Sequence, residues 1–273
     1  MRIALVQQRA TLDRESNRQR ALDAVVEAAR RGAQVVAFAE LGFEPFYPQE
    51  RARPELLSLA EPIPGETTSR FASLARELGV VLVLNLFERD GERTFDTSPV
   101  IDADGTLLGR TRMIHITDYP CFWEQGYYAP GDTGAPVYDT RFGKIGVAIC
   151  YDRHYPEYMR ALALGGAQVV VVPQAGAVGE WPEGLFEAEM RVAAFQNGYF
   201  TALCNRVGEE TCLTFAGESF VCDPAGRVIA RAGALTEETL LCDLDLAQVE
   251  KSHAGQLFLR DRRPELYPGW LAK

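Results

Sequence analysis

The chain has 273 residues, of which 47% are hydrophobic, and a formal net charge of −10 at pH 7. This length suits one sizeable α/β domain, and the acidic balance argues against a nucleic-acid partner, because no basic stripe is available to cover phosphates. An anionic membrane surface is disfavoured for the same reason, and the apolar runs are too short to span a bilayer.

The first half of the chain predicts alternating strands and helices. In chain order we expect a strand over 2–7, a helix over 14–31, a buried strand over 33–40, a helix over 66–78 and a strand over 80–88. Gly32 and Gly79 stand just past the two helices, where a helix commonly ends. Turn signals at Asp90-Gly91 and Asp104-Gly105 then indicate an antiparallel meander. Because the N-terminus reads as a strand and not as a signal peptide, we expect a cytoplasmic protein.

The second half repeats this scheme. We expect a strand over 144–150, a helix beginning near Pro156, a strand over 167–173, a helix over 184–197, a strand over 199–205 and further strands to about 245. Such alternation is typical of sheets covered by helices, and the two halves indicate two sheets packed together with helices outside. No linker interrupts the sequence, so residues 1–273 are one domain, with a charged and aromatic tail over about 255–273 that we expect to cover a surface.

Six cysteines are scattered through the chain without a C-x-x-C pair, at positions 121, 150, 204, 212, 222 and 242. This spacing does not favour a zinc site, and in a reducing cytosol a disulfide framework is improbable. We therefore expect most of these thiols to be core residues, and Cys204, Cys222 and Cys242 to be structural.

Two reactive side chains are predicted at strand ends. Glu40 closes one buried strand and Cys150 closes another, and reactive groups collect beyond the carboxyl ends of strands in α/β sheets. Taken singly, each has an ordinary structural interpretation: Glu40 as a solvated carboxylate and Cys150 as a small hydrophobic residue. Together they suggest a carboxylate base beside a thiol nucleophile, which needs an activating partner near neutral pH.

Several motifs in order resemble the nitrilase superfamily of carbon–nitrogen hydrolases over nearly the whole chain. They are AQVVAFAELGF, GRTRMIHIT, CFWEQGYYAPGD, FGKIGVAICYDRHYPE, GAQVVVVPQA, EMRVAAFQNGYF, NRVG and FLRDRRPELY. The chain looks most similar to the N-carbamoyl amine and acid amidohydrolases, which include β-ureidopropionase. The resemblance implies an α-β-β-α sandwich and a thiol-dependent hydrolase without metal or other cofactor.

The same resemblance implies roles for individual residues. Cys150 would attack the carbonyl carbon, Glu40 would act as general base and then acid, and Glu124 would be a second carboxylate that orients them. The family's catalytic lysine falls in a pattern of the kind G-x-x-R-K-x-H. In this chain Gly109, Arg112 and His115 match that pattern and Met113 occupies the lysine position.

The missing ammonium group is not replaced from nearby. Arg112 should face the opposite side of its strand, and Lys144 lies six residues before Cys150, or roughly 20 Å along a strand. Losing one such electrostatic donor typically costs on the order of 10² to 10³ in rate. The substitution is compatible with an engineered change, with a natural variant of weak activity or with a non-catalytic relative.

The resulting prediction is hydrolysis of a small linear amide or N-carbamoyl compound through an acyl group on Cys150, impaired by Met113. The alternative is a catalytically silent protein that binds a small molecule or a partner through the same pocket. Tyr151, Arg153 and His154 are candidate substrate-binding residues, and the last two favour an acidic substrate group. Relatives form assemblies, so we also expect a homodimer or a larger homo-oligomer.

Overall fold

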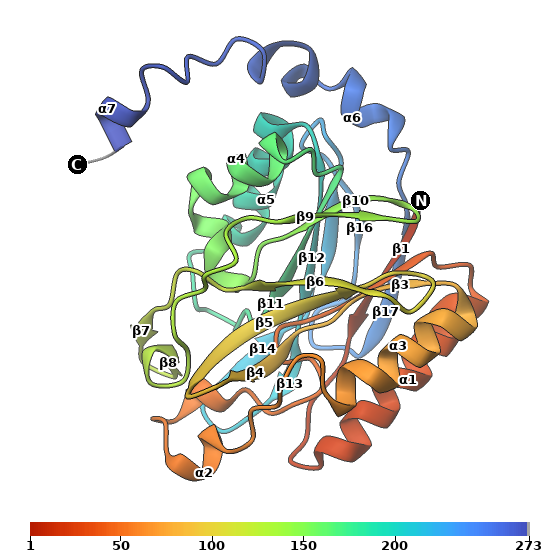
Figure 1. The fold of residues 1–273 in the computed structure, drawn as a ribbon, viewed down its shortest axis with the longest axis vertical. Helices are drawn as coiled ribbons and strands as arrows, with labels where there is room; N and C mark the ends of the chain where they lie inside the picture. The colour runs from red at the N-terminus through yellow and green to blue at the C-terminus, as the bar shows by residue number, and fades with distance from the viewer. Residues whose placement is uncertain (272–273) are drawn as a thin grey trace.

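The computed structural model describes residues 1–271 (Figure 1). The first part of the chain forms β1 (Arg2–Gln7), α1 (Arg14–Arg30), β2 (Val35–Phe38), η1 (Tyr47–Gln49), α2 (Pro54–Leu57), α3 (Glu66–Leu78), β3 (Val81–Val83), β4 (Leu86–Asp90), β5 (Arg93–Ile101) and β6 (Leu107–Arg112). Together with β17 (Glu238–Asp243), these strands build a seven-stranded sheet in the order β17-β1-β2-β3-β5-β4, with β6 also paired to β5.

The later part of the chain builds a second, six-stranded sheet in the order β16-β15-β12-β11-β10-β9. The elements from here on are β7 (Asp118–Tyr119), β8 (Phe122–Trp123), η2 (Glu124–Gly126), β9 (Val137–Thr140), β10 (Gly143–Val147), η3 (Cys150–His154), α4 (Pro156–Leu164), β11 (Val169–Gln174), α5 (Leu185–Asn197), β12 (Phe200–Asn205), β13 (Val207–Glu209), β14 (Thr214–Ala216), β15 (Phe220–Cys222), β16 (Val228–Arg231), α6 (Ala247–Lys251), η4 (Ala254–Phe258) and α7 (Pro268–Leu271).

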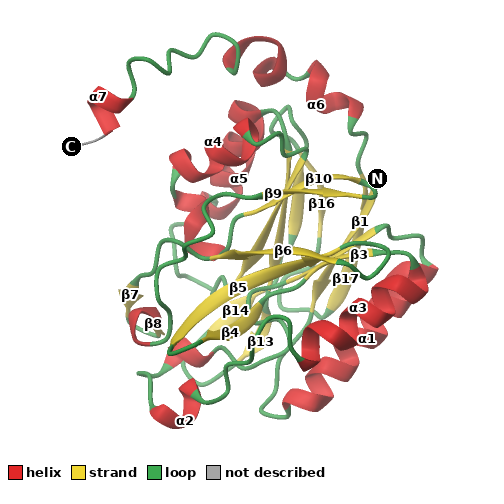
Figure 2. Ribbon diagram, in the orientation of Figure 1, coloured by secondary structure: helices red, strands yellow, loops and turns green. Residues whose placement is uncertain are grey.

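The two sheets face each other and the helices lie outside. One buried cluster contains residues of β1, β2 and β3 together with residues of β10, β11 and β12, so it fills the space between the sheets. A second cluster joins the first sheet to α1 and α3, and a third joins the second sheet to α4 and α5. Figure 2 shows these helix pairs on opposite sides of the strands. The predicted four-layer α-β-β-α sandwich is therefore confirmed.

Two predicted strands end earlier than expected, and this places the candidate residues in turns. The strand predicted over 33–40 ends at Phe38, and the strand predicted over 144–150 ends at Val147. Leu41 and Cys150 both have positive φ, 44° and 41°, which residues with side chains seldom adopt. The backbone thus turns sharply at both sites, instead of continuing as a strand.

The tail extends away from the two sheets after it passes α5. Phe258 packs edge-on against Phe195 of α5, with ring centroids 5.4 Å apart. Beyond that contact the described residues are mostly exposed, and the tail arches over the α4 side of the molecule in Figure 1. We expected the tail to cover a surface of the chain, and only the first few residues of the tail do so. Among the described residues, none of the helices has the length and apolar character needed to cross a membrane.

Candidate active site

The candidate nucleophile sits on the turn that follows β10. Cys150 is 4% exposed and begins the short helix η3. Its thiol accepts a hydrogen bond from Gln174 Nε2 at 3.2 Å, and Arg153 Nη1 donates to both the Cys150 carbonyl (2.9 Å) and Gln174 Oε1 (2.8 Å). Arg153 and Gln174 therefore fix the turn and the direction of the sulfur.

Gln174 is a site residue that the sequence analysis missed. It ends β11, which lies beside β10 in the second sheet. A polar residue at the carboxyl end of an apolar strand, next to the strand that leads to Cys150, was the available signal.

The Glu40 carboxyl group is fully buried without a charged partner. It follows β2 of the facing sheet, is 0% exposed, and neither of its carboxyl oxygens has a hydrogen-bond donor among the described residues. Burial, followed by the nearby Glu124 charge, raises the pKa of Glu40 to about 8. Glu40 is consequently a base poised near neutral pH.

Glu124 supplies a second buried carboxyl group. It starts η2 after the β7–β8 hairpin, is 1% exposed, and its Oε2 accepts a hydrogen bond from the Thr117 N–H at 3.4 Å. Burial and the charge of Asp96 hold the pKa of Glu124 well above its usual value. The pKa of the Cys150 thiol is also raised, first by burial and then by Glu40, so the resting sulfur is a neutral thiol.

Asp96 is a third buried acid that the sequence analysis did not identify. It lies on β5, is 1% exposed, and its Oδ1 accepts a hydrogen bond from Asn85 Nδ2 at 2.6 Å. Asn85 Oδ1 in turn accepts from the Leu41 N–H at 2.7 Å. Asn85 therefore connects Asp96 to the turn that carries Glu40, and this explains why the strand predicted over 80–88 is divided at this residue into β3 and β4.

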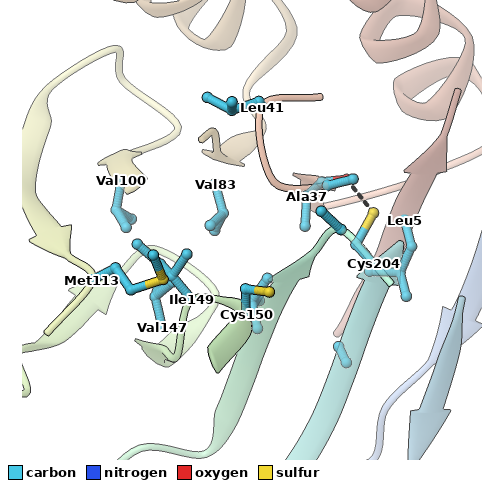
Figure 3. Close-up of a cluster of buried hydrophobic side chains, with 14 of the residues drawn as sticks. Leu5, Ala37, Leu41, Val83, Val100, Met113, Val147, Ile149, Cys150 and Cys204 are labelled. Atoms are coloured by element: carbon cyan, nitrogen blue, oxygen red, sulfur yellow. Dashed lines mark hydrogen bonds between the residues drawn. The ribbon is translucent and has the colours of Figure 1, made fainter. Parts of the chain in front are cut away.

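Met113 lies between the sheets near these groups and is 1% exposed. Figure 3 shows its thioether beside Val147 and Ile149, with Cys150 in the same buried cluster. The Met113 N–H donates to the Asp96 carbonyl at 2.9 Å, so the residue that follows β6 is held beside β5. An apolar side chain here leaves the buried carboxyl groups without an adjacent ammonium group.

The segment after Met113 is tied to the nucleophile turn by Asp152. The Asp152 carboxylate accepts hydrogen bonds from the Ile114 and His115 N–H groups, at 3.2 and 3.0 Å, and lies 2.7 Å from His115 Nδ1. The His115 ring also stacks on Tyr155 with centroids 3.4 Å apart. These contacts hold the Met113 segment beside Cys150.

The neighbouring cations point elsewhere, as predicted. Arg112 donates to Glu88 (2.8 and 2.7 Å) and to Asp132 (2.8 Å). Lys144 is exposed at the far end of β10. Neither side chain forms a hydrogen bond with Glu40, Asp96 or Glu124.

Comparison with known protein families shows which family the chain belongs to. A profile described as carbon–nitrogen hydrolase matches residues 2–254. The chain belongs to the carbon–nitrogen hydrolase family. It is 37% identical to the N-carbamoylputrescine amidase of Solanum lycopersicum, over 97% of this chain and 93% of that protein. The resemblance found in the sequence is thereby confirmed.

Solved structures of the family match the whole fold. The carbon–nitrogen hydrolase from Helicobacter pylori G27 is 30% identical over 99% of this chain and 98% of that chain, with a TM-score of 0.93. A mutant of the amidase from Nesterenkonia sp. AN1 is 29% identical over 99% of this chain and 97% of that chain, with a TM-score of 0.84. That mutant carries the acetamide moiety of fluoroacetamide on its active site cysteine.

In this carbon–nitrogen hydrolase, the three predicted substrate-binding residues differ in accessibility. The Arg153 side chain is 1% exposed, and its Nε lies 3.2 Å from Glu189. His154 Nδ1 lies 2.5 Å from the same glutamate. Tyr151 and His154, but not Arg153, line a cavity of about 270 Å³ beside the nucleophile turn, together with Trp181 and Glu189. The Arg153 side chain therefore stabilises the turn that carries Cys150.

A further carboxylate near the thiol comes from the loop after β11. Glu180 accepts a hydrogen bond from the Tyr119 hydroxyl at 2.7 Å and from the Ala177 N–H at 2.9 Å. Its charge contributes to the raised pKa of Cys150, after burial, Glu40 and Glu124. The sequence analysis missed Glu180, because an acidic residue in a glycine-rich loop looks like a solvated one.

One expectation about the cysteines is wrong. Cys121 and Cys212 form a disulfide, although they are 91 residues apart in the sequence. The bond joins the tip of the β7–β8 hairpin to the tip of the β13–β14 hairpin, a meeting of two loops that spacing cannot reveal. Cys204, Cys222 and Cys242 are buried and free, as predicted.

Proposed function

We propose that this chain hydrolyses a non-peptide C–N bond in a small linear amide or N-carbamoyl compound, with the Cys150 thiol as nucleophile. The observation that carries the proposal is a thiol on a positive-φ turn, enclosed with the buried acids Glu40 and Glu124. Family membership and the modified cysteine of the Nesterenkonia amidase support the same chemistry.

In the proposed reaction, Glu40 moves one proton through the cycle. The Cys150 sulfur bonds to the carbonyl carbon while its proton passes to Glu40, and Glu40 delivers that proton to the leaving nitrogen as the C–N bond breaks. Water then attacks the thioester, giving its proton to Glu40, and the thiol is restored. A carboxyl group with a pKa of about 8 suits both directions of this transfer near neutral pH. Glu124 orients the reacting groups.

We place the part of the substrate that does not react against Tyr151, His154 and Trp181. Since Arg153 and His154 are both paired with Glu189, the pocket has no free cation for a substrate carboxylate among these residues. The carboxyl group of Glu180, which receives hydrogen bonds from neutral groups only, favours a neutral or cationic substrate instead. N-carbamoylputrescine amidase, the relative described above, is named for a substrate with an amine group.

Mass spectrometry tests the nucleophile directly. Protein incubated with small amides, N-carbamoyl amines and fluoroacetamide should gain one adduct at Cys150, and released ammonia should be measurable with the hydrolysable compounds. Cys150→Ala should show neither, whereas Cys204→Ala, which removes another buried thiol, should retain both. Absence of an adduct and of turnover, including in Met113→Lys, would contradict the proposal.

A second candidate function is favoured by one observation, the apolar side chain of Met113 in the site. On this alternative the protein is catalytically silent and binds a small molecule or a partner through the same pocket. Tight binding of N-carbamoyl compounds by calorimetry, without turnover by either the wild type or the Met113→Lys variant, would identify it.

We also infer that the chain assembles as a homodimer or a larger homo-oligomer through its tail. The support is a set of exposed apolar side chains on a segment that extends from the body: Leu257, Phe258, Leu266 and Trp270. Exposed apolar groups clustered in one segment commonly mark an interaction site.

A further inference from the structure

We propose that Asp96 is a positioning residue for Glu40: its carboxyl group stays protonated and donates a hydrogen bond to the Glu40 carboxylate. This inference rests on the proposed role of Glu40 as base. It explains how a site with methionine in place of an ammonium group can still ionise its base near neutral pH.

The connection between the two acids is geometric. Asn85 donates to Asp96 Oδ1 at 2.6 Å and accepts from the N–H of Leu41, the residue after Glu40, at 2.7 Å. A further hydrogen bond, from Asn85 Nδ2 to Ser98 Oγ at 3.1 Å, holds the amide in place. These bonds orient one oxygen of Asp96 and leave the other, Oδ2, free for Glu40.

The two acids carry three buried carboxyl oxygens without an ordinary donor. For both carboxyl oxygens of Glu40 and for Oδ2 of Asp96, no described residue forms a hydrogen bond of normal geometry. The Cys150 thiol and then Asp96 act as donors that lower the pKa of Glu40, and the same contact raises the pKa of Asp96. Two carboxylates cannot make such a contact, because each only accepts, whereas a carboxylic acid and a carboxylate can. A proton between them satisfies atoms that would otherwise be buried at a high cost.

The surrounding charges favour protonation of Asp96. The ionisable groups that face the pair are Glu124 on η2, Cys150 on η3, Asp152 on η3, Tyr128 after η2 and Arg206 after β12. Arg206 is the cation among them, but it donates its hydrogen bonds to the carbonyls of Glu40, Leu41 and Glu44 and to Glu210. Burial and then Glu40 raise the pKa of Asp96 well above its usual value. The hydrogen bond from Asn85 acts in the opposite direction and lowers the pKa of Asp96, but its effect is smaller than those of burial and Glu40.

Asp96 keeps its proton throughout the reaction, so the proton balance of the proposed cycle is unchanged. The thiol proton still travels through Glu40 to the leaving nitrogen. Asp96 supplies only the hydrogen bond that stabilises the Glu40 carboxylate before the thiol proton arrives and after it has left. This is the stabilisation that an ammonium group beside Glu40 would otherwise provide.

The pH dependence of Cys150 alkylation by iodoacetamide tests the inference without requiring turnover. In the wild type, the rate should rise with pH as Glu40 ionises. Asp96→Asn retains an N–H donor, so the midpoint of this rise should stay within half a pH unit of the wild-type value. Asp96→Ala loses the donor, so the midpoint of the rise should shift to higher pH by at least one unit. The alkylation rate at pH 7 should fall at least tenfold.

A matched control and a second measurement complete the test. Asp139→Asn removes an exposed carboxylate on β9 and should leave the profile unchanged. In wild-type protein labelled with ¹³C-aspartate, infrared spectroscopy at pH 7 should show a protonated carboxyl band that is missing in Asp96→Asn. If Asp96 is ionised at rest, Asp96→Asn will instead shift the midpoint of the rise to lower pH by one unit or more, and the wild-type protein will lack the labelled band. Either result overturns the inference.

The same data separate this inference from the proposed function. A normal alkylation profile with the predicted response to Asp96 variants, but no hydrolysis of any substrate, would contradict the proposed function alone. Hydrolysis through Cys150 with profiles that do not respond to Asp96→Asn would contradict the inference alone.

Discussion

At the scale of single residues, the largest expected effect on rate belongs to Met113. Its thioether is buried in the same cluster as Cys150, where a positive charge would stabilise both the attacking thiolate and the oxygen of the tetrahedral intermediate. We therefore expect Met113→Lys to raise kcat/KM for amide or N-carbamoyl hydrolysis by about 10²- to 10³-fold. The buried carboxyl groups of Glu40 and Glu124 would compensate the new charge.

The control for Met113→Lys is Met113→Leu, which fills a similar volume without charge and should give no gain. The two variants should be compared by steady-state release of ammonia at pH 7. Equal rates for the lysine and leucine forms would show that a missing cation does not limit the reaction.

Single residues also show what can be predicted from the sequence. Glu40, Glu124 and Cys150 were identified from motifs and strand ends, and the structure brings all three into one buried region. Asp96 was not identified, because a carboxylate within a strand normally indicates a solvated face, and its burial depends on Asn85 of another strand. Gln174 and Glu180 were missed for the related reason that their partners, Cys150 and Tyr119, are distant in sequence.

At the scale of elements, helices were predicted more accurately than strand ends. The helix α3 ends at Leu78, where Gly79 adopts a φ of 68°, as its sequence indicates. The strands before Glu40 and Cys150 end earlier than predicted, because sharp turns held by side chains of other elements replace the last strand residues. Apolar composition alone does not distinguish a buried strand from the buried turn that follows it.

The disulfide between two hairpins carries a prediction at the same scale. It joins the β7–β8 hairpin, which directly precedes Glu124, to the β13–β14 hairpin. Gln49 supports the junction, since its Oε1 accepts from the Cys212 N–H at 3.1 Å. Reduction, or the double variant Cys121→Ser/Cys212→Ser, should lower the free energy of unfolding by about 2–4 kcal/mol. Denaturant titration with and without dithiothreitol measures the change.

The thiol count provides the check on this prediction. Unfolded protein without reductant should show four reactive thiols, because two of the six cysteines are in the disulfide. Adding reductant to the double variant should change nothing further. Six reactive thiols in freshly isolated protein, with no effect of reductant on stability, would contradict the expected contribution of the bond.

At the scale of the whole molecule, the tail is the segment that leaves large apolar side chains exposed to solvent. The body is closed on both sides by helix pairs, whereas Leu266 is 40% exposed and Trp270 is 63% exposed. Because a second copy offers the same unpaired segment, a symmetric exchange of tails would bury these side chains in both protomers. We therefore expect a dimer at micromolar concentration, and deletion of residues 260–273 should convert it to a monomer.

Light scattering after size-exclusion chromatography measures this change in mass. The double variant Leu266→Ser/Trp270→Ser should weaken the dimer as the deletion does, because it removes the apolar contacts and keeps the chain length. Glu265→Gln, which changes one exposed charge on the same segment, should leave the dimer intact. The Cys150 alkylation rate should be unchanged in all three variants, since η4 retains its contact with α5 and the site lies between the sheets. A monomeric full-length chain, or a dimer indifferent to loss of the tail, would show that the tail does not mediate assembly.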